Sequence, residues 1–378
     1  MKIGLVCPYN INKHGGVLEV ILALKNGLES RGHDVRIITP KPRGADQIHI
    51  DGVIFVGVST DFRSPSHTTT QVSSNGDEEI IQKMLEEENF DVLHFHEPWV
   101  PLLSRQILQL SNSVNIATFH AKVPESIMSR SMIKAVSPYL KSVMKYLDVL
   151  TAVSSSGAEY ASNLTEMPIT IIPNGIDLGK YKHQVQTEKS KDDDKTILYV
   201  GRLERRKGVK YLLKAFALLQ DSNPNTKLLI AGDGPDREKL EMLADDLKIE
   251  NIEFLGFISE EHKIELLADA DIFCSPAVFG ESFGIVLLEA LATGTVTVAG
   301  NNSGYIDVMQ GTGAISIVDP HSTEEFSRRL DLLLNDNDLR KLWKQWASDY
   351  VLQFNYPTVI DTYEELYKKA LINHDHKR

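Results

Sequence analysis

Short apolar runs rich in β-branched residues alternate with helical stretches along most of this chain, and they do so in two successive series. Strands that are separated by helices form parallel sheets, which helices cover on both faces. A chain of 378 residues is also too long for one ordinary hydrophobic core. The sequence therefore predicts an α/β protein with two domains, each built on a parallel sheet.

The expected elements are assigned from these runs. In the first series, strands are expected at residues 2–7, 34–39, 53–58, 91–95, 114–118 and 149–153, with helices at 17–31 and 78–88. In the second series, strands are expected at residues 196–200, 227–231, 252–255, 271–274, 295–299 and 314–318. Residues 61–76 carry few apolar side chains and are predicted to form a mobile loop.

A polar run separates the two series. No apolar residue lies between Val185 and Ile197, so residues 184–195 are predicted to be an exposed linker. The N-terminal domain would then span residues 1–183 and the C-terminal domain residues 196–356. Residues 357–378 have apolar side chains at helical spacing, which predicts a C-terminal helix. That helix could dock on either domain, and so could cross back to the N-terminal one.

The charge balance excludes one class of partner. The net charge is −12, whereas nonspecific binding to phosphate needs a broad cationic face, so no nucleic acid is expected as a partner. Residues 122–147 form a basic amphipathic segment. It could make peripheral contact with an anionic membrane, or it could be a helix that covers the sheet and keeps one face in water.

The cysteines and the first residues of the chain indicate the cellular compartment in which the protein is expected. Cys7 and Cys274 both lie in apolar runs, so packing is expected rather than a disulfide or a metal site. The first residues resemble a strand rather than a signal peptide, and no run is long enough to span a bilayer. A cytoplasmic location is expected, with membrane association on the inner face as the alternative that residues 122–147 leave open.

Residues 280–294 predict a helix whose start could bind an anion. Ser282 is a suitable N-cap, an apolar run follows, and Gly294 provides a stop. The first amides of such a helix have no internal acceptor and point at solvent or at a phosphate. The candidate ligand-binding residues at this start are Ser282, Phe283, Gly284 and Ile285.

Two carboxylates flank this helix start. Glu281 precedes the helix and Glu289 lies about two turns along it, roughly 12 Å away if the spacing is helical. One could therefore bind a sugar while the other binds a ribose. The alternative is an ordinary amphipathic helix in which Glu289 is solvated.

A cluster of cations follows the first strand of the second series, at Arg202, Arg205, Arg206 and Lys207. Ligands of open parallel sheets bind at the carboxyl ends of the strands. The guanidinium of Arg202 and the ammonium of Lys207 could neutralise a diphosphate leaving group without a metal. The alternative is a solvated basic turn.

In the first domain, the candidate ligand-binding residues are glycines and histidines. Gly15 and Gly16 open the first long helix and would let the backbone approach a ligand closely, although they do not form a dinucleotide-binding fingerprint. His94 and His96 are interpreted as structural, whereas His120 is expected to hydrogen-bond a sugar hydroxyl or an acceptor. A metal site would need a third ligand at defined spacing.

Together these segments resemble the family 4 retaining glycosyltransferases of GT-B architecture, in which two Rossmann-like domains with parallel sheets face each other across a cleft. Within that family the chain resembles the phosphatidylinositol mannosyltransferases, through residues 6–9, 94–98 and 280–287. The wider resemblance lies in residues 15–16, 94–98, 118–120, 172–177, 201–208, 231–235 and 254–256 and in the pair Glu281 and Glu289.

The resemblance implies a role for each candidate residue. Glu281 would bind hydroxyls of the donor sugar, Glu289 the ribose, and Arg202 and Lys207 the donor diphosphate. The remaining assignments are Gly16 on the phosphate and acceptor side, His120 at the sugar, and residues 257–263 near the base. In that last segment, Glu260 could accept from guanine N1–H and N2–H while Lys263 approaches O6, which favours GDP over UDP.

The activity implied is that of a hexosyltransferase that moves a hexose, with mannose from GDP-mannose favoured, to a lipid-linked or glycan hydroxyl with retention. The N-terminal domain would be the acceptor side. The nucleotide-sugar donor is a substrate, and no cofactor or metal is expected. Two alternatives stay open: a nucleotide-sugar 2-epimerase of the same fold, which acts on the donor alone, and a non-catalytic nucleotide-sugar-binding module.

Overall fold

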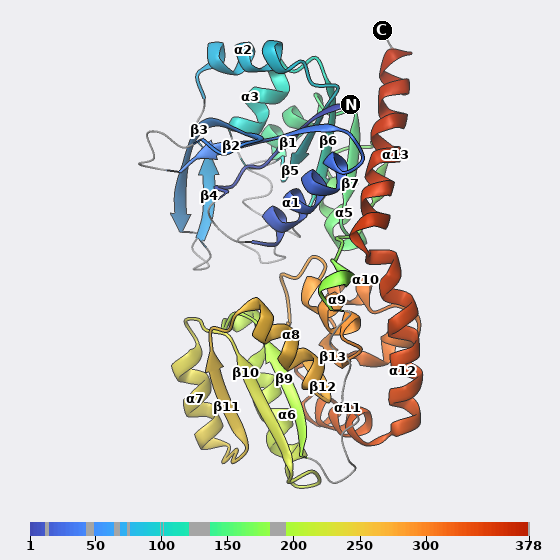
Figure 1. Cartoon of the computed structure of the whole chain (residues 1–378). Helices are drawn as coiled ribbons and strands as arrows, with labels where there is room; N and C mark the ends of the chain where they lie inside the picture. The colour runs from blue at the N-terminus through green and yellow to red at the C-terminus, as the bar shows by residue number, and fades with distance from the viewer. Residues whose placement is uncertain are drawn as a thin grey trace. The chain divides into compact units, whose positions relative to one another are not determined.

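The computed structural model describes residues 1–11, 15–42, 49–63, 69–73, 76–98, 100, 102–120, 137–181 and 194–376. The chain divides into two compact units, Met1–Gly175 with Tyr356–Arg378, and Ile176–Asn355 (Figure 1). At the start of the second unit, the amide of Ile176 donates to Phe354 O at 2.8 Å. Most of the predicted linker, residues 184–193, lies outside the described part of the chain.

The first unit contains a sheet in the order β4-β3-β2-β1-β5-β6-β7-β8. Its strands other than β4 pair in parallel, as predicted. They are β1 (Lys2–Val6), β2 (Asp34–Lys41), β3 (Val53–Arg63), β5 (Val92–His96), β6 (Val114–Phe119), β7 (Val149–Ala152) and β8 (Ile169–Ile171). The last of these was not expected from the sequence.

Strand β4 (Thr69–Ser73) corrects one prediction. It pairs antiparallel with the end of β3, in a register that runs from Ser59 opposite Ser73 to Arg63 opposite Thr69. The prediction of a mobile loop over residues 61–76 is therefore wrong for the residues that pair, because their backbone groups are satisfied by a ladder of hydrogen bonds. Residues 64–68 and 74–75 lie outside the described part of the chain.

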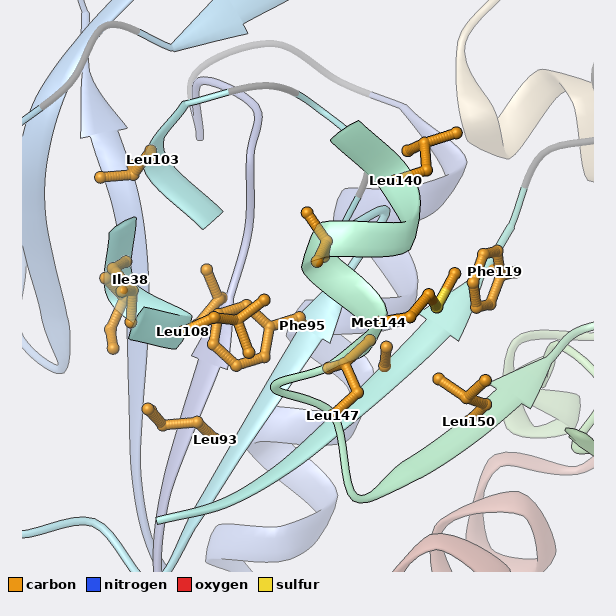
Figure 2. Packing of buried hydrophobic residues seen from close by; sticks show 14 of the residues in the cluster. Ile38, Leu93, Phe95, Leu103, Leu108, Phe119, Leu140, Met144, Leu147 and Leu150 are labelled. Atoms are coloured by element: carbon orange, nitrogen blue, oxygen red, sulfur yellow. The ribbon is translucent and has the colours of Figure 1, made fainter. Parts of the chain in front are cut away.

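Helices cover both faces of this sheet (Figure 1). They include α1 (Gly16–Glu29), α2 (Glu78–Glu88), α3 (Leu103–Leu110), α5 (Ser155–Ser162) and α13 (Tyr356–Asp375). On one face, side chains of α2, α3 and residues 140–147 pack against the strands. Leu108 and Leu147 are examples from the covering segments, and Phe95 and Phe119 are examples from the strands (Figure 2). On the other face, α1 and α13 pack against Ile3, Leu5 and Ile37.

The C-terminal helix α13 thus belongs to the first unit. It lies close to α1, where a Cβ on Gly27 would come within 2.1 Å of Ile360 Cδ1. Tyr363 and Tyr367 of α13 are fully buried in the same cluster. The absence of a side chain at Gly27 therefore allows the two helices to approach.

Part of the basic segment predicted over residues 122–147 is described. Residues 137–144 are helical, and Leu140, Val143 and Met144 are buried in the core while Lys141 and Lys145 are exposed. This part is a sheet-covering helix with one face in water. Residues 122–136 lie outside the described part of the chain.

The second unit contains a parallel sheet in the order β11-β10-β9-β12-β13-β14. Its strands are β9 (Lys195–Val200), β10 (Thr226–Ala231), β11 (Ile252–Gly256), β12 (Ile272–Ser275), β13 (Val296–Gly300) and β14 (Ile317–Val318). Strand β14 is shorter than the predicted 314–318, because residues Gly311–Ser316 form a 3-10 helix. The α/β prediction with parallel sheets is confirmed in both units.

The helices of the second unit are α6 (Val209–Leu219), α7 (Arg237–Asp246), α8 (Glu260–Asp269), α9 (Ile285–Ala292), α10 (Ser303–Val308), α11 (Thr323–Asn335) and α12 (Asn337–Tyr350). Short 3-10 turns occur at Leu178–Lys180, Arg205–Lys207 and Val351–Phe354. Helix α6 lies beside α7 and α11, and α9 lies beside α8 and α12.

Cys7 in the first unit and Cys274 in the second are both buried and free. Burial raises the pKa of the Cys7 thiol to about 12 and the pKa of Cys274 well above its ordinary value. The prediction that both serve in packing is confirmed. None of the described helices combines the length and the apolar character needed to cross a membrane.

Candidate active site

Helix α9 begins later than predicted. Its N-cap is Gly284, at φ 108°, so the prediction that Ser282 is the N-cap is wrong. Only glycine takes this backbone conformation readily, and a Cβ at Gly284 would come within 2.6 Å of Tyr305 Cε1. The left-handed conformation at Gly284 interrupts the helical backbone there, and the close approach of Tyr305 leaves no room for a side chain at this position. Gly294 at φ 70° ends the helix as predicted, with its amide donating to Leu291 O.

The carboxylate of Glu281, just before this helix, lies against two cations. Its Oε1 is 2.8 Å from Lys207 Nζ and also contacts Arg206 Nη1. Lys207 belongs to the 3-10 turn after β9, and Glu281 to the loop after β12, which is the neighbouring strand. The structure thus brings together two residues that the sequence assigned to one site.

Arg206 is the cation that the sequence interpretation missed. Its Nε is 2.6 Å from Glu204 Oε1, and its backbone carbonyl accepts from the amide of Val278. Burial would lower the pKa of Arg206, but the charges of Glu281 and Glu204 raise it above the ordinary value. The cluster of cations was visible in the sequence, but the contact between its backbone and the loop at Val278 was not.

Arg202, the other cation expected at the diphosphate, is placed differently. Its side chain is 56% exposed, and its Nε is 3.8 Å from Glu204 Oε2. It therefore lies beside Glu204 with much of its guanidinium accessible to solvent, whereas Arg206 and Lys207 are held by Glu281.

A second group of charges joins α8 to α9. Lys263 Nζ is 2.7 Å from Glu289 Oε1 and 2.8 Å from Glu260 Oε2. The Glu289 side chain is only 10% exposed, so the alternative of a solvated Glu289 is wrong. Burial would lower the pKa of Lys263, but Glu289 and Glu260 raise it. The structure therefore brings together all three residues predicted at the ribose and the base.

An exposed aromatic side chain lies in the short segment between β11 and α8. Phe257 follows β11 and is 91% exposed, which is unusual for a phenylalanine. The sequence interpretation assigned residues 257–263 to the base without giving Phe257 a role. Its exposure beside α8 makes it a candidate for stacking on a planar ring.

In the first unit, helix α1 starts with an open backbone. Gly15 is its N-cap, in an extended conformation with no side-chain cap, and a Cβ at Gly15 would meet no atom of the described residues within 4 Å. Gly16 is the first helical residue. The residues just before them, 12–14, lie outside the described part of the chain.

The two histidines of β5 and the histidine that follows β6 form a buried layer. His94 is satisfied on both ring nitrogens, by Tyr367 Oη and Thr118 Oγ1, each at 2.6 Å, which confirms its structural interpretation. His120 is 9% exposed, and its Nε2 is 2.8 Å from His96 Nδ1. Burial lowers the pKa of His120 to about 3, with a smaller opposing contribution from a hydrogen bond to Asn174.

These candidates share one position in their sheets. Residues 202–207, 257–263 and 276–284 follow β9, β11 and β12, at the carboxyl edge of the second sheet, and His120 follows β6 at the carboxyl edge of the first. Ligands of parallel sheets bind at this edge. In the described parts of both units, no three His, Cys, Asp or Glu side chains are grouped so as to hold a metal ion.

Comparisons with known proteins agree with this arrangement. Residues 14–180 match the family model for Glycosyltransferase Family 4, and residues 181–349 match that for Glycosyl transferases group 1. The chain is 30% identical over 361 residues to phosphatidyl-myo-inositol mannosyltransferase of Mycolicibacterium smegmatis, which covers 95% of this chain and 91% of that protein. It is 32% identical to the enzyme of the same name from Propionibacterium freudenreichii, over 82% of this chain and 79% of that protein.

Solved structures share the fold. A glycosyltransferase from Rickettsia africae superposes with a TM-score of 0.76 at 19% identity, covering 98% of both chains. HepE of Anabaena, solved with UDP and glucose, gives a TM-score of 0.73 at 16% identity, covering 98% of this chain and 100% of that one. The chain therefore belongs to the GT-B glycosyltransferases that combine a family 4 N-terminal region with a group 1 C-terminal region.

Proposed function

We propose that this glycosyltransferase moves mannose from GDP-mannose to a hydroxyl of a lipid-linked acceptor, with retention at the anomeric carbon. The observation that carries the proposal is the pair of charged groups at the carboxyl edge of the second sheet. One joins Glu281 to Lys207 and Arg206, and the other joins Lys263 to Glu260 and Glu289. The first suits a sugar diphosphate, and the second suits a nucleoside.

The diphosphate assignment follows from charge. When the bond between the anomeric carbon and the diphosphate breaks, negative charge develops on the leaving oxygens. Lys207 and the accessible guanidinium of Arg202 would stabilise that charge without a metal, and more strongly in the transition state than in the ground state. Glu281, which precedes the open start of α9, would accept hydrogen bonds from hydroxyls of the hexose.

The preference for guanine rests on Glu260 and Lys263. A carboxylate can accept from both N1–H and N2–H of guanine, whereas uracil has no exocyclic amine. Glu260 is half exposed and is held by Lys263, which Glu289 anchors in turn. Glu289 would also reach the ribose. HepE of Anabaena was solved with UDP, so binding of GDP donors must be compared with binding of UDP donors.

For retention we favour a front-side route. The incoming hydroxyl forms a new bond to the anomeric carbon on the face from which the diphosphate leaves, and its proton passes to a leaving diphosphate oxygen. His120 and Gly16 of the first unit would bind the sugar and the phosphate or acceptor side. Neither cofactor nor metal enters these steps.

The acceptor is proposed from the relatives, whose names specify phosphatidyl-myo-inositol. We propose a lipid-linked hydroxyl, with phosphatidylinositol as the first candidate and a glycan as the alternative. Such a substrate would place the protein at the inner face of the cytoplasmic membrane as a peripheral protein.

A thermal-shift screen of GDP, UDP and ADP sugars tests the donor, because a ligand that binds only the folded state raises the melting temperature. We expect the largest shift with GDP-mannose. Turnover is then measured with labelled GDP-mannose and phosphatidylinositol vesicles, with and without a chelator. Donor consumption without acceptor would indicate the 2-epimerase, and tight donor binding with no product from any acceptor would indicate a binding module.

A further inference from the structure

The imidazole rings of His96 and His120 lie against each other at the carboxyl edge of the first sheet. His96 closes β5, and His120 follows the adjacent parallel strand β6. Their rings are nearly parallel, with centroids 5.1 Å apart, and His96 Nδ1 is 2.8 Å from His120 Nε2. His96 has no exposed surface. The hydrogen bond between the rings is therefore shielded from water.

The residue after His96 holds the backbone of His120. Glu97 Oε1 accepts from the amide of His120 at 3.0 Å, and the amide of Glu97 donates to Thr118 O at 3.0 Å. Glu97 has φ 54°, a conformation uncommon for residues with a side chain. A residue keeps such a strained conformation only where contacts with the surrounding structure fix its backbone. The end of β5 thus holds His120 at two points, its backbone amide and its ring.

Both rings are neutral near neutral pH. Burial lowers the pKa of His120 to about 3, and burial, with the charges of His94 and His120, lowers the pKa of His96 well below its ordinary value. A neutral imidazole carries one N–H and one lone-pair nitrogen. Since a single proton can lie between His96 Nδ1 and His120 Nε2, the tautomer of one ring dictates the tautomer of the other.

The other nitrogen of His96 indicates which tautomer is present. His96 Nε2 is buried and has no hydrogen-bond partner among the described residues. A buried N–H without an acceptor is rare because its desolvation is not compensated. The proton of His96 therefore belongs on Nδ1, from which it is donated to His120 Nε2, and His120 must carry its own proton on Nδ1.

We propose that His96 is a positioning residue for His120. By occupying the Nε2 lone pair of His120, His96 keeps the proton of His120 on Nδ1, the nitrogen that remains for the hydrogen bond to Asn174 and that a substrate oxygen would take over as acceptor. His120 then acts as a hydrogen-bond donor to a substrate oxygen and not as a proton acceptor. The substrate in this statement rests on the proposed function, whereas the tautomer is a property of the free protein.

The test is a tautomer measurement on the full chain labelled with 15N-histidine. Long-range 1H–15N correlations distinguish the two tautomers, and the resonances of His120 are assigned by their loss in His120→Gln. In the unsubstituted protein we expect His120 to be protonated on Nδ1. In His96→Leu that signature should be lost, and kcat should fall about tenfold, the size expected for one buried hydrogen bond.

His96→Asn provides the rescue. The side-chain amide of asparagine places a donor near the position of His96 Nδ1, so the signature of His120 and most of kcat should return. Thr151→Val is the matched control, because it removes a buried hydroxyl that bonds Thr118 Oγ1 at 2.6 Å in the same layer. It should lower stability and leave the tautomer of His120 unchanged.

His120 protonated on Nε2 in the unsubstituted protein, or an unchanged signature in His96→Leu, would overturn the role of His96. If His96→Leu does not fold, the tautomer of the unsubstituted protein and of His96→Asn decides the question. An absence of transfer with every donor would overturn the proposed function but would not alter the NMR pattern, so the two failures are distinguishable.

Discussion

The carboxylate of Glu281 and the ammonium of Lys207 form an ion pair, with Oε1 and Nζ 2.8 Å apart. The two residues are far apart in sequence, but they follow β12 and β9, which are adjacent and parallel. The same carboxylate contacts Arg206. One side chain therefore orients two cations at the edge of the sheet where a donor diphosphate is proposed to bind.

Replacing Lys207 by Ala should lower turnover more than donor binding. The ammonium would act mainly on charge that develops in the transition state, so kcat should fall roughly 100- to 1,000-fold while the donor dissociation constant changes little. Steady-state kinetics and calorimetric titration with GDP-mannose separate the two quantities. Lys210→Ala, a change to a nearby lysine that lies over the ring of Tyr211, is the control. Unchanged turnover in Lys207→Ala would count against the role.

Arg206→Lys should weaken the site although the charge is kept. A lysine cannot bridge Glu204 and Glu281 with a planar fork, so Glu281 loses one of its two anchors. We expect kcat/KM for the donor to fall about tenfold, the size of one charge-assisted hydrogen bond. Arg205→Lys, at the exposed neighbouring position, is the matched control and should have no effect. Equal kinetics for both variants would show that Arg206 only balances surface charge.

Glu260→Gln should change the preference for the base. The substitution removes an acceptor for guanine N1–H and N2–H, so the dissociation constant for GDP should rise about tenfold while that for UDP stays the same. Titration with both nucleotides measures the ratio. Glu261→Gln, on the exposed adjacent position, is the control. A similar loss for GDP and UDP would contradict guanine recognition by Glu260.

The buried histidines predict a loss of stability in acid. Burial lowers the pKa of both His94 and His120 from 6.5 in the unfolded reference to about 3, and a charged His120 adds to the effect at His94. Between about pH 6.5 and about pH 3, the unfolded chain binds protons that the folded chain does not. The free energy of unfolding should therefore fall as the pH drops below about 6.5, by about 1.4 kcal/mol per pH unit for each such histidine.

Urea unfolding followed at about pH 7.5 and about pH 5.5 measures this slope. His94→Gln removes one of the titrating groups, so the fall in the free energy of unfolding between these two pH values should be smaller by about 1.4 kcal/mol, even though the variant is less stable at both. If the slope is the same with and without His94, the histidine is charged in the folded state and the buried layer is not neutral.

Tyr367→Phe tests how α13 is attached to the first unit. The substitution removes the hydroxyl that bonds His94 Nδ1 at 2.6 Å and leaves a buried nitrogen without a partner. We expect the free energy of unfolding to fall by about 1–3 kcal/mol. Tyr146→Phe, at a partly exposed tyrosine whose hydroxyl accepts from Gln109 at 3.4 Å, should change it by less than about 0.5 kcal/mol. Equal losses would mean that the bond to His94 contributes little.

Local patterns were sufficient for the elements and for the general position of the site. The alternation of apolar runs predicted parallel sheets, because strands buried on both faces need apolar side chains throughout. The placement of Lys207 at the carboxyl edge of the second sheet followed from the rule that ligands of parallel sheets bind there. Glu281 was found through the predicted helix start, and Glu260 and Lys263 through the resemblance to a known family.

Contacts between residues far apart in the sequence decided the start of α9, the cations that contact Glu281 and the pairing at the end of β3. Ser282 has the chemistry of an N-cap, but α9 starts after Gly284, whose left-handed backbone lies too close to Tyr305 for any side chain. Arg206 rather than Arg202 contacts Glu281, because the 3-10 turn at residues 205–207 and the loop at Val278 pair through their backbones. The antiparallel end of β3 depends on backbone pairing with β4, and apolar side chains do not report such pairing.

The physical distinction is one of range. Hydrophobic periodicity and the conformational preferences of glycine act over a few residues, so they can be interpreted along the chain. Which carboxylate meets which cation, and which ring nitrogen of a buried histidine is occupied, depends on atoms that come within 3 Å only after the strands have paired. Glu289 illustrates this: its spacing in the chain fits a solvated helix face, but Lys263 of α8 holds it in a buried ion pair.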